Sequence, residues 1–402
     1  MMVARWMAVP ALALAACGSR KPTYHEDVAP ILAERCAGCH NREGVAPVPP
    51  LTTYEEAVRV RQQIKRTVQT RKMPPWGADN TSLCGTWEDA LWLSDKQIAT
   101  LVAWVDGDVA VGDPSRAEAR PIPTPPALQK PGAVLDMGGE YTPGLGRASY
   151  RCFRLEPKVT GDALVTALRV VSSEPRAVAQ VTLFALDSEA AQARAAALDA
   201  EDPGLGYACY GDARVEGARF LASWTWSNPV LRLPHGTGVR LGTGGVVMQV
   251  HYDVTAVGLA APSRSRVEFE LAPPNAATEA AILALRPDRF ELPGGLRYTE
   301  VVAEERVTQP LTLRAVSPRM HTLGKGLQID LQRGASQRCV ANFDHWNFYR
   351  QQLFRLERPV RLEPGDRLRI SCVYNTLGQS APVAMGEDIS AEECLAYLYV
   401  TP

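Results

Sequence analysis

Apolar residues near the start of the chain recur three and four positions apart, which is the spacing of amphipathic helices. One such helix is predicted over residues 27–35. Capping boxes begin two more, at Thr53 and at Ser94, where Ser or Thr is followed three residues later by Glu or Gln. We expect the second helix to reach about Arg71. Residues 18–112 therefore predict a small all-α domain.

The period of the apolar pattern changes to two after residue 132. Short apolar runs alternate there with turns rich in Gly and Pro, which is typical of antiparallel β-sandwiches. This part of the chain is longer than one sandwich needs, and Pro273-Pro274 is a suitable seam between two. We therefore expect one all-β sandwich over 133–272 and another over 273–402. The runs that indicate strands are residues 163–171, 178–186, 245–254, 327–331 and 367–374.

Two segments lie outside these predicted domains. The proline-rich residues 113–132 predict a stiff, extended linker. At the start of the chain, an apolar run too short to span a bilayer follows Arg5, which is typical of a secretory signal. Residues 14–18 resemble a bacterial lipobox, so that 1–17 would be a lipoprotein signal peptide and Cys17 the acylated end of the mature protein. An ordinary signal cleaved nearby is the alternative, and both predict export to the periplasm or the outer surface of a bacterial membrane.

Composition excludes one class of partner. The 402 residues have a formal net charge of −1, and 46% of them are hydrophobic. A protein that binds nucleic acid needs a basic surface, and this balance gives no sign of one. We therefore expect no nucleic acid among the partners.

Cys36, Cys39 and His40 form the motif that attaches haem covalently. Each thiol makes a thioether to one haem vinyl group, and the adjacent imidazole is then held under the iron as its proximal ligand. A zinc site would need further Cys or His at similarly close spacing, which Cys84 and His25 do not supply. A chance occurrence of the motif is the other alternative. The motif predicts a c-type cytochrome domain with haem c as its cofactor.

Met73 is the predicted sixth ligand of the iron. It directly precedes Pro74-Pro75-Trp76, where the prolines forbid a helix and hold the chain extended. Methionine ligation raises the reduction potential and suits electron transfer. His25 is the rival ligand, and a packing role for Met73 is a further alternative. The passage from Tyr24 to Gly107 resembles the small cytochrome c domains of exported bacterial proteins, which implies a redox partner protein or a small electron donor or acceptor.

The nine cysteines predict an oxidised, cross-linked structure. Assigning Cys17 to lipid and two others to haem leaves six. We expect one bridge inside each sandwich, while the two cysteines left over, if paired, would join the haem domain to the second sandwich. The pairs are Cys152 with Cys209, Cys372 with Cys394, and the leftover Cys84 with Cys339.

Six short motifs follow one another along the second part of the chain: Tyr150-Arg151-Cys152-Phe153, Gly206-Tyr207-Ala208-Cys209-Tyr210-Gly211, Val250-His251-Tyr252-Asp253, His321-Thr322-Leu323-Gly324-Lys325, Gly365-Asp366 and Glu392-Glu393-Cys394. In this order they resemble the copper type II, ascorbate-dependent monooxygenases, a family that includes peptidylglycine hydroxylating and dopamine beta monooxygenases. The resemblance covers residues 133–402, and bacterial relatives with a cytochrome fused in front look most similar. It implies two jelly-roll-like sandwiches, each presenting one copper. Three histidines hold the metal on the first, and two histidines and a methionine hold it on the second.

Most of the copper ligands that the resemblance implies are missing. In the first sandwich the adjacent histidine pair falls on residues 179–180, which are Ala and Gln, and only the third position is kept, as His251. In the second sandwich the His-x-His motif falls on residues 319–321, which keep His321, and the methionine falls on Glu393. Alanine or arginine does not replace the imidazoles and the thioether that hold copper. We therefore expect copper to be absent, with His251 and His321 as vestigial copper positions.

An ion pair is predicted where the second copper would lie. Side chains alternate along a strand, so Arg319 and His321 face the same way. If Glu393 keeps the place of the methionine, its carboxylate meets the Arg319 guanidinium in a charge-assisted hydrogen bond. The alternative is that both are solvated charges at a rim. His251 shares one strand face with Gln249, as a relic in a polar groove would, and residual metal binding at His251 or His321 stays open.

Three functions are compatible with these features. The first, which we favour, is an exported, lipid-anchored electron-transfer protein whose sandwiches have lost their coppers and serve as a docking or binding module. The second is a copper monooxygenase that hydroxylates a C–H bond with the haem as electron source, which the loss of ligands disfavours. The third is a structural or sensory haem protein without turnover, which the intact haem motif disfavours.

Overall fold

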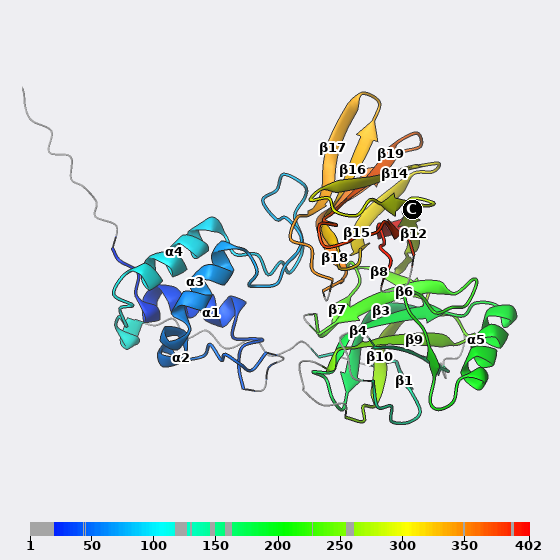
Figure 1. Ribbon diagram of the computed structural model, residues 1–402, viewed down its shortest axis with the longest axis horizontal. Coiled ribbons are helices and arrows are strands. Elements are labelled where there is room, and N and C mark those ends of the chain that lie inside the picture. Colours follow the sequence, from blue (N-terminus) through cyan, green and yellow to red (C-terminus); the bar gives the residue numbers. More distant parts are fainter. Residues whose placement is uncertain are drawn as a thin grey trace, which may run out of the picture.

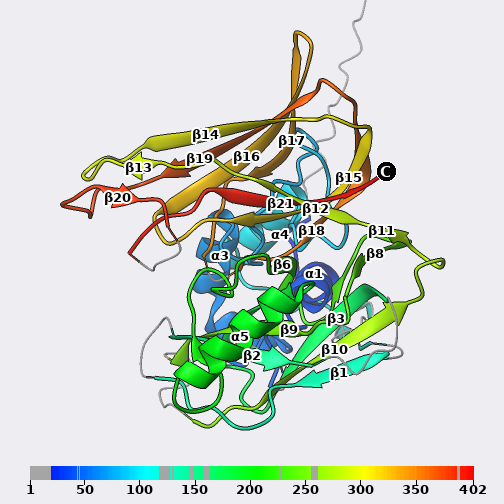
Figure 2. The same cartoon turned by 90° about the vertical axis from the view of Figure 1, so that its right-hand side faces the viewer.

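The computed structural model divides the chain between a group of helices and a larger part built mostly of antiparallel sheets (Figure 1). A view at right angles shows the sheets layered above one another (Figure 2). Cys17 and the predicted signal peptide lie outside the residues that the structure describes, which are 20–42, 44, 46–116, 127–128, 131–144, 149–156, 163–226, 228–254, 261–348, 350–386 and 390–402.

The predicted capping boxes at Thr53 and Ser94 are confirmed. Each hydroxyl accepts from the backbone N–H three residues on, and the side chain found there accepts from the backbone N–H of the capping residue. The second helix does not run unbroken to Arg71 as predicted, because Val60 departs from helical geometry, with φ −115° and ψ 17°, and divides it in two. The helices are η1 (Tyr24–Val28), α1 (Ala29–Arg35), α2 (Tyr54–Arg59), α3 (Arg61–Gln69) and α4 (Asp95–Asp106).

The proline-rich linker is described only in part. Its start is not extended as predicted, because Pro114–Arg116 form a short 3-10 helix, η2. Residues 117–126 and 129–130 of the predicted linker lie outside the described residues.

One segment between α3 and α4 leaves the helices and packs on the second sandwich. We call residues 76–92 the arm; Figure 1 shows it as a light-blue loop that reaches the upper sheets. Cys84 of the arm is bonded to Cys339, which confirms the third cysteine pair. The backbone N–H of Glu88 donates to the carbonyl of Arg355 at 2.9 Å. The arm is therefore part of the core of the second sandwich, although it lies within the sequence of the predicted haem domain.

We expect replacement of both Cys84 and Cys339 by Ser to loosen the arm. The two residues are 255 positions apart, and a bridge that closes a long loop contributes about 2–4 kcal/mol to the free energy of unfolding. Limited proteolysis should then cut the arm faster, and denaturant titration should show a loss of about that size. Unchanged cleavage and stability would mean that buried contacts of the arm, such as those of Trp87, hold it without the bridge.

The first sandwich packs two sheets, and the strands predicted within it are confirmed. Cys152 and Cys209 are bonded as predicted. One sheet has the order β5 (Tyr207–Ala208), β2 (Ser149–Leu155), β9 (Val246–Tyr252), β4 (Val178–Ala185), β6 (Arg219–Thr225). The other has the order β1 (Ala133–Asp136), β10 (Ser265–Ala272), β3 (Leu164–Ser172), β8 (Thr237–Arg240), β11 (Thr278–Glu279), with β7 (Leu231–Arg232) paired to β3.

A helix within the first sandwich corrects the expectation that this part is all-β. Helix α5 (Glu189–Glu201) begins where the Ser188 hydroxyl accepts from the backbone N–H of Ala191 at 3.1 Å. Its sequence is rich in alanine, which has the highest helix propensity, and it buries Ala195 and Leu198. The expectation rested on period-two runs elsewhere and overlooked this capped, alanine-rich stretch.

The second sandwich begins where the chain crosses over at residue 280, because β11 still pairs with β8 while the next strand joins new partners. Its predicted strands and the Cys372–Cys394 bridge are confirmed. One sheet has the order β12 (Ala281–Leu285), β21 (Leu395–Thr401), β15 (Leu311–Arg319), β18 (Phe354–Leu362). The other has the order β14 (Thr299–Arg306), β19 (Arg367–Tyr374), β16 (Gly324–Arg333), β17 (Ser336–Phe343), and β13 (Glu291–Leu292) pairs with β20 (Val383–Ala384).

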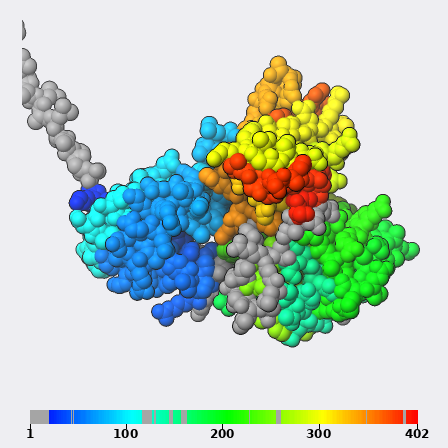
Figure 3. All heavy atoms as spheres, viewed as in Figure 1, coloured from blue at the N-terminus to red at the C-terminus, as the bar shows by residue number. Residues whose placement is uncertain are grey.

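The two sandwiches touch through β6 of the first and β21 of the second. The rings of Phe220 and Tyr397 stack with centroids 3.8 Å apart, and the Tyr399 hydroxyl donates to the carbonyl of Leu221 at 2.8 Å. The space-filling view shows the helical part lying against the second sandwich (Figure 3). Two junctions result, one between the sandwiches and one between the helices and the sandwiches, and each contains a candidate site.

Candidate functional sites

A cavity of about 420 Å³ opens among the helices. Its wall brings together Cys36, Cys39, His40 and Met73, the four residues predicted to hold haem. Helix α1 positions the first thiol, because the backbone N–H of Cys36 still donates to the carbonyl of Leu32 at 2.9 Å. Cofactor sites commonly have volumes of about 300–1,000 Å³. The cavity is therefore large enough to take a cofactor.

The imidazole of His40 is oriented for a metal. Its Nδ1 lies 2.9 Å from the carbonyl oxygen of Pro49, so the Nδ1–H donates to this carbonyl and Nε2 keeps its lone pair. Histidines that bind a metal through one ring nitrogen commonly donate the other N–H to a backbone carbonyl. The carbonyl of His40 itself accepts from the backbone N–H of Leu51 at 2.8 Å, which ties this loop in place. This orientation, with Nδ1 bonded to the backbone, is the one that ligation through Nε2 would need.

The two thiols of the haem motif are free. Among the described cysteines, Cys36 and Cys39 are the two that form no disulfide. Burial raises the pKa of the Cys36 thiol to about 12 and also raises that of Cys39. Both thiols are therefore neutral at physiological pH, because burial in an apolar wall disfavours the charged thiolate. Two free thiols beside one cavity fit thioether attachment.

The rest of the cavity wall is mainly apolar. Val48, one of its residues, is 84% exposed, which is unfavourable for a large apolar side chain unless something covers it. The flat apolar ring of a haem would do so, and the residues present therefore fit this group. Other apolar members of the wall are Leu32, Leu51, Val60, Ile64, Val68 and Leu91.

The cavity distinguishes the two candidates for the sixth ligand. Met73 lines it, whereas His25 is not among its lining residues and belongs to η1. The wall is completed by Trp226 and Arg350, which come from the first and second sandwiches. Sequence reasoning missed these two, because nothing near them in the chain shows that they approach the haem motif.

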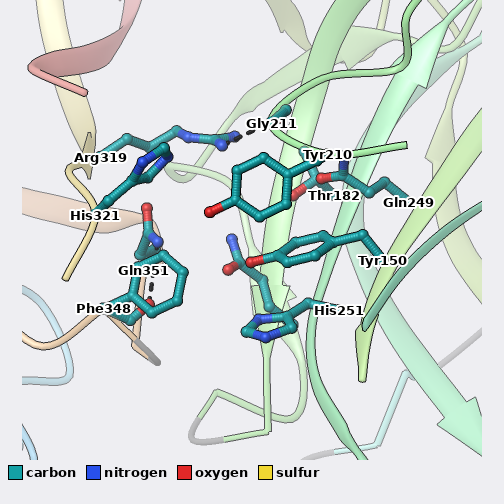
Figure 4. Close-up of a pocket in the computed structure, with 11 residues that line it drawn as sticks. Tyr150, Thr182, Tyr210, Gly211, Gln249, His251, Arg319, His321, Phe348 and Gln351 are labelled. Atoms are coloured by element: carbon teal, nitrogen blue, oxygen red, sulfur yellow. Dashed lines mark hydrogen bonds between the residues drawn. The ribbon is translucent and has the colours of Figure 1, made fainter. Parts of the chain in front are cut away.

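A second site lies between the sandwiches (Figure 4). It brings His251, on β9, together with Arg319, the last residue of β15, and His321, which follows that strand. Its volume is only about 10 Å³, which is room for about one water molecule. The pocket is therefore filled by its own side chains. These are Tyr150, Gln180, Thr182, Tyr210, Gln249, His251, Arg319, His321, Phe348 and Gln351, with Gly211 of the backbone.

The predicted ion pair in this pocket is confirmed. Nε of Arg319 donates to Oε2 of Glu393 at 3.2 Å, and Nη2 donates to the carbonyl of Gly211 at 3.1 Å. Arg319 is only 6% exposed, so neither group is a solvated rim charge. Burial alone would lower the pKa of Arg319, but the Glu393 carboxylate more than offsets this and raises it. The guanidinium is therefore a permanent, buried cation.

His321 is fastened by the loop that precedes β21. Its Nδ1 lies 2.9 Å from the carbonyl of Ala391, and its Nε2 lies 3.8 Å from Oε2 of Glu393. The carboxylate of Glu392 accepts from the backbone N–H groups of His321 and Leu323. Burial raises the pKa of Glu392 to about 7. Sequence reasoning assigned no role to Glu392, although it adjoins Glu393 in one of the quoted motifs.

Aromatic rings fill the space between the two histidines (Figure 4). Tyr150 stacks on His251 with centroids 4.3 Å apart and an interplanar angle of 10°. Tyr210 then packs edge-on against Tyr150 at 4.5 Å and against His321 at 5.7 Å. His251 is 1% exposed and lines the pocket together with Gln249, which shares its strand face as predicted, but aromatic rings surround it in place of the predicted polar groove.

The residues of this pocket do not fit copper in either implied form. Among the described residues, no three His, Cys, Asp or Glu side chains are arranged to hold a metal. Gln180, at one position of the implied histidine pair, donates to the hydroxyl of Ser223. A charged guanidinium occupies the implied second site, and a cation there opposes a metal ion.

Comparisons with known proteins support a monooxygenase-like module in the β part. Residues 299–401 match the family described as copper type II ascorbate-dependent monooxygenase, C-terminal domain. Dopamine beta-hydroxylase of Rattus norvegicus is 26% identical over 207 residues, which cover 45% of this chain and 32% of that protein. Tyramine beta-hydroxylase of Caenorhabditis briggsae is 25% identical over 197 residues, which cover 45% and 34%. Peptidylglycine alpha-amidating monooxygenase of Rattus norvegicus is 26% identical over 190 residues, which cover 46% and 19%.

The chain spans only about a third or less of the length of these relatives. Similarity to a family named for copper favours copper as a cofactor, whereas the side chains of the pocket oppose it. The likeness to solved structures is weak: the major capsid protein P2 from Bacteriophage PM2 has a TM-score of 0.29 at 12% identity, covering 67% of this chain and 97% of that one.

Three disulfides and similarity to such relatives indicate an extracellular or secreted protein. Within the described part of the chain, no helix is long and apolar enough to cross a membrane.

Proposed function

We propose that the protein is an exported c-type cytochrome for single-electron transfer, joined to a copper-monooxygenase-like module that no longer binds copper. In this proposal residues 18–112 form the haem domain, 113–132 the linker, and 133–279 and 280–402 the two sandwiches of the module, because β11 still pairs within the first sandwich. Cys17 anchors the protein to a bacterial membrane. Its partner is a redox protein or a small electron donor or acceptor.

The observation that supports the haem is the cavity of about 420 Å³ with Cys36, Cys39, His40 and Met73 in its wall. A haem bound there supplies a one-electron couple. The hydrogen bond from His40 to Pro49 holds the imidazole in the orientation a ligand needs. The apolar wall excludes water, and a thioether on the sixth position favours the reduced iron. These properties suit electron transfer better than oxygen binding.

The observation that supports the loss of copper is the buried pair of Arg319 and Glu393. The guanidinium donates hydrogen bonds to the carboxylate of Glu393 and to the carbonyl of Gly211, so neither oxygen is available to a metal. The sandwiches then serve as a docking or binding module, which the arm joins to the haem domain.

An active copper monooxygenase is the second candidate, because residues 299–401 match that family. It would need His251 or His321 to recruit ligands other than those of the family pattern. The two proposals differ in the metal they require, and metal content therefore separates them.

We expect the purified, exported protein to contain iron in a one-to-one ratio to chain and no copper after exposure to copper and dialysis. Elemental analysis and the haem absorbance of the same sample check this. The matched control replaces Cys36 and Cys39 by Ser, which removes covalent haem without touching the sandwiches. One or two coppers per haem would favour the monooxygenase, and a protein without haem after export would overturn the cytochrome proposal.

A further inference from the structure

We propose that a groove of about 450 Å³ between the helical part and the second sandwich binds a carboxylate group. The groove lies where these two parts meet (Figure 3). Its wall shares Met73, Pro75 and Arg350 with the cavity among the helices, so a bound anion would lie next to Met73, the predicted sixth ligand. This inference identifies a ligand class for the redox site and rests on the proposed function.

The charges around the groove favour an anion. Arg71 is bonded to Asp95 at 2.6 Å, and His345 lies 3.7 Å from Asp344, a residue outside the wall. Lys72 and Arg350, the other two basic side chains of the wall, form no ion pair with any described carboxylate. The titratable residues of the wall are all basic: Arg71, Lys72, His345 and Arg350.

The environment of Arg350 is the strongest evidence for a bound anion. Its guanidinium carbon lies 4.4 Å from the ring centroid of Trp226, and its buried Nη1 has no hydrogen-bond partner among the described residues. Burial lowers the pKa of Arg350 to about 10. Arg35 on the same cavity also has one buried nitrogen, Nε, without a hydrogen-bond partner in the described part of the chain, but it differs from Arg350 in having a counter-charge, the carboxylate of Glu34. A partly buried cation without a counter-charge is unfavourable, and a bound anion would remove that cost.

Aromatic rings make up much of the remaining wall. Trp76 packs edge-on against Phe354 with centroids 5.0 Å apart, and Phe343 and Trp346 also line the groove. Cations beside aromatic rings suit a carboxylate on a flat apolar body. Two sources have this chemistry: a propionate of the haem itself, reaching in from the adjoining cavity, or a free small carboxylate.

Benzoate is the probe, and uncharged benzamide is its matched control. Isothermal titration of the full-length holoprotein follows measurement of its haem content. If the source is a free carboxylate, the wild type binds benzoate and not benzamide, and Arg350→Gln weakens benzoate by about tenfold or more, as loss of a charge-assisted hydrogen bond predicts. Arg361→Gln removes the same charge from an exposed pair with Glu363 and should have no effect.

If the source is a haem propionate, benzoate does not bind, because the groove is filled. Arg350→Gln then lowers the haem midpoint potential relative to Arg361→Gln, since the uncompensated carboxylate favours oxidised iron. Arg350→Lys, which keeps the charge, should restore most of the potential or the binding. If Arg350→Gln does not fold, Lys72→Gln at an exposed position replaces it. This variant should also weaken benzoate binding or lower the midpoint potential.

If the protein binds no benzoate and Arg350→Gln does not shift the potential, the inference is overturned and the haem proposal stays intact. Absence of haem from the wild-type protein would overturn the proposed function instead. The benzoate titration tests the groove in that case too, because it does not need haem for its readout.

Discussion

Met73→Ala is expected to open the sixth position of the haem iron and to lower its midpoint potential by at least about 0.1 V, since axial-ligand identity spans roughly 0.8 V. Met73 is presented to the cavity just before Pro74 and Pro75, so no neighbouring side chain takes its place without moving this loop. The absorbance spectrum should change from low-spin to high-spin, and added imidazole should restore a six-coordinate, low-spin form. Spectroelectrochemical titration of the purified protein measures both changes.

His25→Ala is the matched control, because His25 is the rival ligand and does not line the cavity. Its spectrum and potential should equal those of the wild type. A low-spin spectrum that survives in Met73→Ala and is lost in His25→Ala would assign the ligand to His25. That result would also mean that η1 moves when haem binds, because its first turn is held by the hydrogen bond from the backbone N–H of His25 to Val111.

Local signals in the sequence predicted much of this architecture. The capping boxes at Thr53 and Ser94 depend on residues three apart, and both formed as expected. Strands in the β part followed from alternating apolar runs. The Arg319–Glu393 pair was predicted by combining strand alternation with a family resemblance. Nε of Arg319 lies 3.2 Å from Oε2 of Glu393.

Features that depend on distant parts of the chain were not predictable in the same way. The arm lies among helical residues in sequence, yet Trp87 fits the core of the second sandwich. Likewise, Trp226 and Arg350 reach the cavity proposed for haem only because three separately predicted units pack together. Tyr150 and Tyr210 stand in quoted motifs, but their packing between His251 and His321 depends on the contact between the sandwiches.

The buried pair of Arg319 and Glu393 makes a second large effect testable. Replacing Glu393 alone by Met leaves a guanidinium that is 6% exposed without its carboxylate. Removing one partner of a buried ion pair costs about 3–5 kcal/mol, so the free energy of unfolding should fall by about that amount. Denaturant titration checks this, and Glu393→Gln is the matched control that keeps a hydrogen-bond acceptor for Arg319.

Arg319→His combined with Glu393→Met should recover most of that stability and create a copper site. The two substitutions remove the cation and supply, beside His321, the imidazole pair and thioether that the family resemblance implies for the second sandwich. Elemental analysis should find copper in a one-to-one ratio to chain in the double variant and none in the wild type or either single variant. Equal copper in the wild type would show that the ion pair does not exclude the metal. No copper in the double variant would mean that the packing of Tyr210 against His321 also closes the site.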